Sequence, residues 1–213
     1  MCLLVVSGLF FATGYGQTIQ YGVEGGINVS GARATAPGVV FHGTPGLRFA
    51  IGGYADIALK DTMFSIRPKL FFSREAYTPN IFGDKTPFNI SYFILDIPLI
   101  YHSALGGKKN FFGLGPFFGY GISGNYVYQG METKIAWGNN PNTDDGKRLD
   151  IGFDALVGYQ LNEKIMLSAK LDWGIKDVSA DQSFDKVWTR NFGITFAYEL
   201  GSGSYGVGAF KRK

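Results

Sequence analysis

The chain has 213 residues, with 31 glycine, 19 phenylalanine and 12 tyrosine, and a mean hydropathy of +0.04. No run of about 20 apolar residues occurs, which excludes a membrane-spanning helix. The 20 basic and 17 acidic residues are scattered, whereas a nucleic-acid surface gathers its basic residues, so we expect no nucleic-acid partner. The single cysteine excludes an intrachain disulfide framework.

Residues 1–16 have the pattern of a secretory signal peptide that lacks its charged start. Leu3 to Phe11 would form the apolar segment, and Gly14 and Gly16 supply the small residues that a signal peptidase requires. The alternative is an ordinary buried N-terminal strand. We expect residues 17–200 to form one exported domain and residues 201–213 to form a C-terminal tail.

A two-residue alternation of apolar with polar or very small side chains recurs eight times, which predicts eight β-strands. The alternating segments span residues 19–29, 47–57, 64–73, 92–102, 112–122, 149–160, 165–175 and 191–200. Pro68, Pro98 and Pro116 fall inside three of them, where we expect bulges because proline removes a ladder donor.

The pattern predicts an all-β fold, an eight-stranded antiparallel up-and-down transmembrane β-barrel. Each strand keeps one face apolar over about ten residues, the span of a tilted transmembrane strand. The alternative is a soluble barrel with its apolar face inward, which would rarely leave its solvent face so rich in glycine. The inward face carries charges of both signs, which we expect to form a network in the lumen: Glu24, Arg48, Asp56, Arg67, Lys69, Asp96, Asp150, Asp154, Lys170, Asp172 and Glu199.

An eight-stranded barrel is just wide enough for its own side chains, so we expect a plugged lumen. Buried charges must be paired, and we expect Arg48, Arg67 and Lys69 to meet acids such as Glu24 and Asp96. The bare glycine face of the fifth strand would then form a recess for side chains of the opposite wall.

Short and long links alternate along the chain, as they do in outer-membrane barrels with periplasmic turns and external loops. Short links fall near residues 60–62, 105–109 and 162–164. The predicted external loops are Gly31–Pro45, Glu75–Phe88, Asn125–Lys147 and Asp177–Lys186.

With this orientation, aromatic residues gather at both ends of the lipid face, as in interfacial girdles. The girdle near the short links comprises Tyr21, Phe64, Tyr101, Phe112, Tyr159 and Tyr198. The girdle near the long loops comprises Phe49, Phe72, Phe93, Tyr120, Trp173 and Phe192.

Three stretches carry a resemblance to a known family: YFILDIPLIY at 92–101, FFGLGPFFGYGISG at 111–124, and RLDIGFDALVGYQL at 148–161 followed by a short NEK turn. The chain resembles the small outer-membrane β-barrel proteins of Bacteroidota, described as porin family or PorT-like barrels. The resemblance implies an outer-membrane location, with outer-membrane lipid and the barrel-assembly machinery as partners. Such barrels commonly end in an aromatic residue, so the assembly signal here would be internal, around Phe196–Leu200.

Neither a cofactor site nor an active site emerges from the pattern. Residues 119–124 match G-x-G-x-x-G, but residues 125–146 lack the helical period that a dinucleotide site requires. A third, less favoured alternative is a lipid-modifying barrel enzyme, but His42 and His102 stand at opposite ends of the expected barrel and cannot share one site. Residues 140–146 resemble a calcium loop, yet the glycine falls one place late and no closing glutamate follows. We expect no catalysis, no cofactor and no metal.

Two functional hypotheses remain open. The first is a structural or surface-interaction barrel that contacts a protein or surface ligand through its long loops, especially through Tyr126, Tyr128, Met131 and Trp137. The second is a narrow channel for small solutes or ions.

Overall fold

The computed structural model describes residues 17–36, 39–60, 62–78, 80–81, 84–103, 109–128, 130–180 and 186–205. The expected signal segment, residues 1–16, lies outside the described residues. None of the described residues belongs to a helix long and apolar enough to cross a membrane.

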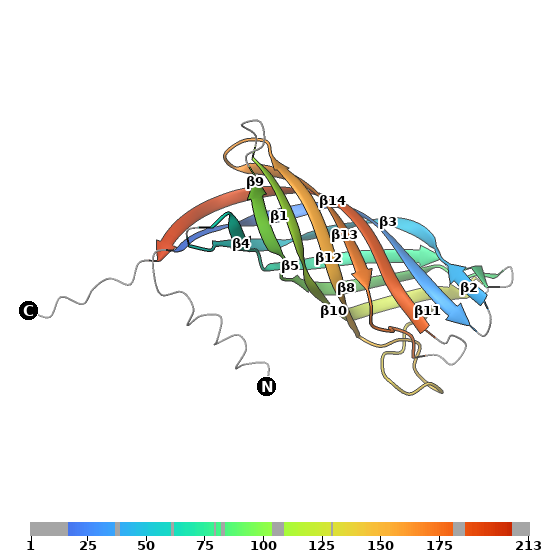
Figure 1. The fold of residues 1–213 in the computed structure, drawn as a ribbon. Helices are drawn as coiled ribbons and strands as arrows, with labels where there is room; N and C mark the ends of the chain where they lie inside the picture. Colours follow the sequence, from blue (N-terminus) through green and yellow to red (C-terminus); the bar gives the residue numbers. More distant parts are fainter. Residues whose placement is uncertain are drawn as a thin grey trace, which may run out of the picture.

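The described residues form fourteen strands (Figure 1). They are β1 (Gln17–Ala36), β2 (Val39–His42), β3 (Thr44–Ala58), β4 (Phe64–Ile66), β5 (Lys69–Thr78), β6 (Asn80–Ile81), β7 (Asp84–Lys85), β8 (Phe88–Asp96), β9 (Leu99–Ser103), β10 (Asn110–Tyr128), β11 (Met131–Lys134), β12 (Leu149–Gln160), β13 (Ile165–Gly174) and β14 (Lys186–Tyr205).

The strand pairings confirm the predicted up-and-down topology. Antiparallel neighbours follow one another as β1, β3, β5, β8, β10, β12, β13 and β14. β1 pairs with β3 on one side and with β14 on the other, so the order of pairing returns to its first strand. The eight predicted strands therefore form an antiparallel β-barrel.

Prolines interrupt two of the predicted strands. The third strand is divided into β4 and β5 around Pro68, and the fourth into β8 and β9 around Pro98. The gaps remain hydrogen-bonded, because the backbone amide of Arg67 donates to the carbonyl of Pro98 at 3.0 Å and that of Ala55 to the carbonyl of Pro68 at 3.0 Å. Pro116 stays inside β10, where it faces Phe153 of β12.

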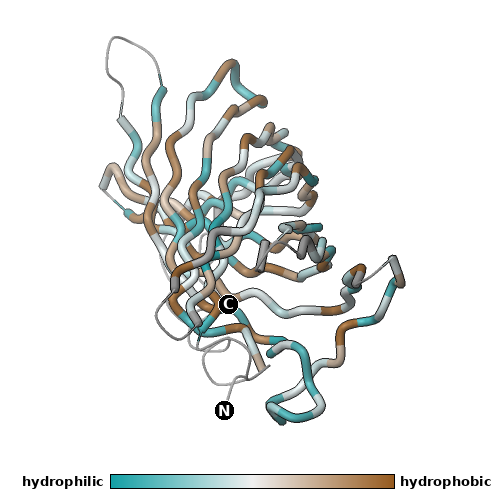
Figure 2. Tube along the Cα trace, turned by 90° about the vertical axis from the view of Figure 1, so that its right-hand side faces the viewer, coloured by the Kyte–Doolittle hydropathy of each residue, from teal (hydrophilic) through white to brown (hydrophobic). Residues whose placement is uncertain are grey.

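The apolar face of every predicted strand lies outward, as the alternation indicated. On β1, Val23 and Ile27 are 47% and 54% exposed, whereas Glu24 and Asn28 are buried. Figure 2 shows the same alternation of hydrophobic and hydrophilic residues along the strands. The outward apolar surface matches the lipid-facing band of a membrane barrel.

Aromatic residues occupy both ends of this outer face. Ten of the twelve predicted girdle residues are exposed, and Phe72 and Tyr159 are half-buried. Neighbouring rings on β3, β5 and β8 contact one another: the Phe49 and Phe72 centroids lie 6.3 Å apart, and those of Phe72 and Phe93 lie 6.0 Å apart.

Strands replace much of the predicted loop structure at one end of the barrel, which we call the loop end; the opposite end is the turn end. β1 runs to Ala36 and pairs with β2, and β10 runs to Tyr128 and pairs with β11. The β10–β11 turn contains Gly130 at φ 80°, a conformation that favours glycine. β2 and β11 lie at the end of the molecule opposite the one where β14 ends (Figure 1).

The expected tail is shorter than residues 201–213. β14 continues to Tyr205, and its last five residues pair with Gln17–Tyr21 of β1. This pairing satisfies backbone groups of β1 that would otherwise form an open edge. Residues 206–213 lie outside the described residues.

Candidate functional site

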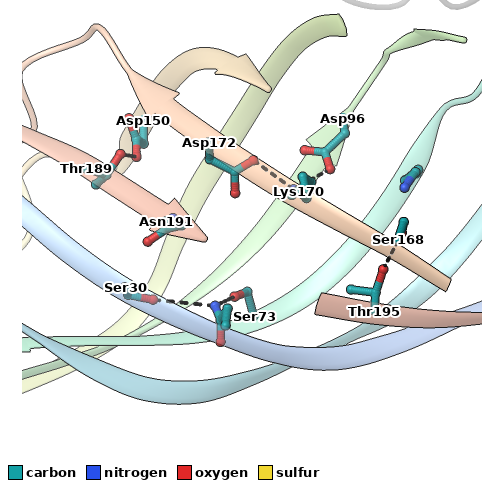
Figure 3. A network of polar contacts seen from close by, with 12 residues as sticks. Ser30, Ser73, Asp96, Asp150, Ser168, Lys170, Asp172, Thr189, Asn191 and Thr195 are labelled. Carbon is teal, nitrogen blue, oxygen red and sulfur yellow. Dashed lines mark hydrogen bonds and ion pairs between the residues drawn. The ribbon is translucent and has the colours of Figure 1, made fainter. Parts of the chain in front are cut away.

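The inner face of the barrel holds most of the predicted charge network, part of which is drawn in Figure 3. Eight members are buried, and Lys170 is 13% exposed. The buried eight are Glu24, Asp56, Arg67, Lys69, Asp96, Asp150, Asp154 and Asp172.

Two ion pairs lie near the turn end of the lumen. The Arg67 guanidinium pairs with the Asp56 carboxylate through both Nε, at 2.7 Å, and Nη2. Lys69 Nζ on β5 lies 3.0 Å from Glu24 Oε2 on β1, and Thr195 donates to the same carboxylate at 2.5 Å. Since β3 stands between β5 and β1, the lysine reaches across the interior.

A second cluster surrounds Lys170 of β13. Its Nζ lies 2.7 Å from Asp96 of β8 and 3.1 Å from Asp172 of its own strand. Because β12 and β10 separate β13 from β8, this pair also crosses the lumen, as Figure 3 shows. Asp154 is fully buried beside this group, and neither carboxylate oxygen has a hydrogen-bond partner among the described residues.

Hydrogen bonds continue the network toward the loop end. Thr189 donates to Asp150 at 2.6 Å, and Asn191 donates to Glu75 at 3.0 Å. Glu75 is a buried carboxylate that the sequence interpretation placed in a loop. The alternation on β5 continues through Lys69, Phe71 and Ser73 to Glu75, and this continuation was the signal that could have identified it.

Arg48 and Glu199 stand apart from the buried ion pairs. Arg48 does not meet an acid among the described residues; its Nη2 donates to the Asn89 side chain at 2.5 Å. The pairing of β3 with β5 is irregular between Pro45 and Ala50, which explains why this side chain leaves the regular inner row. Glu199 is half-buried, near the turn end of β14.

Aromatic rings fill the space between the charges. Phe71, Tyr92 and Phe117 belong to one buried cluster, and the ammonium groups of Lys69 and Lys170 lie 5.8 Å and 5.5 Å from the Phe71 ring centroid. Such cation–π contacts stabilise a desolvated ammonium group. The lumen at this level therefore contains packed side chains.

The glycines of β10 do not form the predicted recess for side chains of the opposite wall. A Cβ on Gly113 would lie 2.6 Å from Ile100 and 2.9 Å from Leu156, which are its neighbours on β9 and β12. A Cβ on Gly121 would lie 2.6 Å from the Trp137 ring. Adjacent strands and a segment after β11 occupy this space, so the opposite wall does not.

The four residues predicted for partner binding have different environments. Met131 is 67% exposed at the start of β11. Tyr126 and Trp137 pack against the buried cluster of Phe71 and Tyr92, and Tyr126 stacks on Phe88 with centroids 5.4 Å apart. The Tyr128 side chain lies outside the described part. Met131 is thus exposed, whereas Tyr126 and Trp137 are partly buried against the core.

An ion pair at the loop end connects the segments before β12 and after β13. Lys147 Nζ lies 2.5 Å from Asp177 Oδ2, and the backbone amides of Ser179 and Val187 donate to Asp177 Oδ1. Burial raises the pKa of Asp177, but these hydrogen bonds outweigh burial and hold that pKa below its usual range. The carboxylate therefore ties residues 147, 179 and 187 together at neutral pH.

The two histidines remain separate. His42 stands in β2, and its side chain lies outside the described part. His102 Nε2 lies 2.8 Å from Ser65 Oγ and 3.9 Å from Asp56 Oδ2. Both contacts use one ring nitrogen, whereas a nucleophile–base–acid relay uses both. Asp56 is moreover committed to Arg67.

In the loop that resembles a calcium site, the carboxylates accept hydrogen bonds from backbone amides. The amide of Asn140 donates to Asp144 at 2.8 Å, and the amide of Ala136 donates to Asp145 at 2.7 Å. Among the described residues, no group of three or more metal-binding side chains is present.

Two solved structures illustrate which folds the chain is similar to. Ail, the attachment invasion locus protein of Yersinia pestis, is 9% identical, with 87% of this chain and 99% of that chain covered and a TM-score of 0.44. Neisserial surface protein A is 14% identical, with 84% and 97% covered and a TM-score of 0.46. No curated protein matches the chain in sequence.

A family assignment comes from the sequence profile. Residues 15–180 match the family described as outer membrane protein beta-barrel domain. The match spans most of the eight-stranded barrel, from the start of β1 to beyond β13. The chain therefore belongs to the outer membrane protein beta-barrel domain family and is a protein of the bacterial outer membrane.

Proposed function

We propose that the protein is a barrel with a side-chain-filled lumen that passes no solutes and that acts at the cell surface by presenting its loop end to a partner. The ion pairs that cross the lumen carry the first half of this proposal. Lys69 is 2% exposed, and Asp96 and Asp154 are 0% exposed. Water does not reach these groups, which argues against an aqueous path at their level.

The loop end supports a role in contacts. The β10–β11 hairpin extends the wall of the barrel beyond the girdle, and the Lys147–Asp177 ion pair fixes the segments beside it. A surface that is ordered before binding loses less conformational entropy on association. Met131, 67% exposed on this hairpin, is the residue that we expect to contact a partner.

Liposome swelling tests the closed lumen. Wild-type protein reconstituted into liposomes is expected to give no swelling with small sugars. A triple variant, Phe71→Ala, Tyr92→Ala and Phe117→Ala, removes rings from the lumen and is expected to allow swelling, which controls for reconstitution. Steady single-channel conductance of the wild type would favour a narrow channel instead.

Site-specific crosslinking in intact cells tests the surface contact. A photo-crosslinking residue at Met131 is expected to capture a partner from the cell exterior. Met63 is a matched control, because it is 63% exposed but lies at the turn end. Adducts from Met63 alone would place the contact on the periplasmic side and contradict the proposed role.

A further inference from the structure

A polar pocket lies on the outer surface of the barrel at the loop end. Its volume is about 570 Å³. It is lined by residues of four neighbouring strands, β5, β8, β10 and β11: Arg74, Asn89, Ser91, Ser123, Gly124, Asn125, Glu132 and Lys134.

The strand register shows that these side chains share the outward face. Ser91 faces both Arg74 of β5 and Ser123 of β10, which forms one cross-strand row. Asn125 faces both Asn89 of β8 and Lys134 of β11, which forms a second row. Directly paired residues of antiparallel strands lie on the same face. The pocket is therefore part of the outer wall and is separate from the lumen.

A β-bulge creates the polar part of this wall. The pairing of β10 with β8 shifts between Gly121 and Ser123, so both Ile122 and Ser123 point outward. Arg148 supports the bulge by donating to the carbonyls of Gly121 and Ile122 at 2.9 Å and 3.4 Å. If β10 alternated regularly through Ile122 without the bulge, Ser123 and Asn125 would face the lumen. Bulges commonly redirect side chains beside functional sites.

The pocket begins directly beyond the aromatic girdle. Phe93 is paired with Phe72 on one side and with Tyr120 on the other. Ser91 follows on the same face two residues along β8, a distance of about 7 Å. Aromatic girdles mark the level of the lipid interface. The Arg74–Ser91–Ser123 row therefore lies at the level of the lipid headgroups.

The pocket has an excess of positive charge. The charged side chains of Arg74 and Lys134 form no ion pair or hydrogen bond with other described residues, and Arg48 donates to Asn89, which lines the pocket. Glu132 is the one acidic residue among those that line it, and the Asn125 side chain donates through Nδ2 to its carboxylate. Two cations against one carboxylate leave the lining a surplus of one positive charge, and the Arg48 guanidinium adds a further cation beside Asn89. Serine and asparagine donors lie between these groups.

We infer that this pocket binds the phosphorylated headgroup of a lipid in the outer leaflet of the outer membrane. Guanidinium, ammonium and hydroxyl donors are the groups that recognise phosphate oxygens. The alternation of link lengths places the loop end outside the cell, so the leaflet in reach is the outer one. A lipid held here would have its acyl chains beside the outward apolar residues of β5, β8 and β10.

Native mass spectrometry of the full chain in dodecyl maltoside micelles, titrated with lipid A, tests this site. Lipid A is a glycolipid that carries two phosphate groups. The double variant Arg74→Gln, Lys134→Gln is expected to bind it about thirtyfold more weakly, because each cation near a charged lipid surface contributes about a factor of five. Ser91→Asp, which adds a carboxylate to the exposed pocket, is expected to weaken binding in a chain that keeps both cations.

A charge-matched control lies on another part of the wall. Arg33 of β1 and Lys186 of β14 are exposed cations at the loop end, and Arg33→Gln, Lys186→Gln should leave the lipid affinity unchanged. An equal loss from both double variants would overturn the assignment of the pocket. Equally tight binding of lipid A without its phosphates would overturn the headgroup chemistry. Displacement of lipid A by millimolar inorganic phosphate would assign the pocket to a soluble anion instead.

Discussion

Replacing Arg67 with alanine is expected to lower the free energy of unfolding by about 3–5 kcal/mol. Arg67 and Asp56 are 3% and 4% exposed, so removing the guanidinium leaves a carboxylate that water cannot reach. The guanidinium also lies 4.6 Å from the Phe111 ring centroid, a cation–π contact that is lost with it. Because both groups are so deeply buried, solvent screening reduces this loss very little.

Urea unfolding of refolded protein in detergent micelles measures the effect. A loss of about 4 kcal/mol lowers the urea midpoint by about 2 M when the m value is ~2 kcal/mol per M. Lys134→Ala removes an exposed cation on β11 and should leave the midpoint unchanged. The double variant Arg67→Met, Asp56→Leu removes both charges and should recover most of the lost stability. Identical midpoints for Arg67→Ala and Lys134→Ala would refute the reasoning.

Three further perturbations probe other parts of the structure. Leu171→Arg, on the lipid face, should impair membrane insertion by about 2–4 kcal/mol, and Ser168→Arg, on the lumen face, should cost less; equal effects would mean that the two faces are wrongly assigned. The pKa of Asp177 is lowered, so its ion pair stabilises the loop end above pH 3.8, and this stabilisation is lost as the pH falls through the lowered pKa. Proteolysis at the loop end should therefore increase at that acid pH in the wild type but not in Asp177→Asn. Gly121→Ala should lower the thermal unfolding temperature, since a tryptophan ring fills the space, whereas Gly203→Ala, with no neighbour within 4 Å, should not.

The two-residue alternation was sufficient to predict the eight strands of the barrel and the face that each presents to lipid. Lipid contact requires an apolar side chain at every second position, so each strand carries the alternation in its own sequence. Strand ends were less predictable. Residues 31–36 and 201–205 contain mostly small side chains without alternating contrast, yet they form strands because β1 and β14 pair along their full lengths.

Most members of the buried charge network could be predicted, but only part of their pairing could. Lys69 meets Glu24, one of the acids expected for it. Arg67 meets Asp56, and Lys170 rather than Arg67 or Lys69 meets Asp96. Which charges face one another across a barrel depends on the stagger of the strands, and alternation alone does not determine this stagger. The position of Trp137 could not be predicted either, because the segment after β11 folds back and places its ring over Gly121.

The bulge in β10 shows how one residue separates two functions along a single strand. Up to Gly121, the inward phase lines the lumen and the outward phase contacts lipid. Ile122 takes the extra position without disturbing the outward apolar face, so the sequence alone contains no sign of the shift. Beyond it, Ser123 and Asn125 point outward, where they can meet lipid headgroups. Had β10 continued in regular register, these polar groups would have enlarged the lumen network and the outer wall would have remained apolar. Deleting Ile122 would remove the bulge but keep Ser123 opposite Ser91 and Asn125 opposite Asn89, so both side chains should still point outward. Lipid A binding should therefore survive this deletion in the native mass spectrometry titration, whereas it should weaken when Arg74 and Lys134 are both removed; a loss as large as in that double variant would contradict the register.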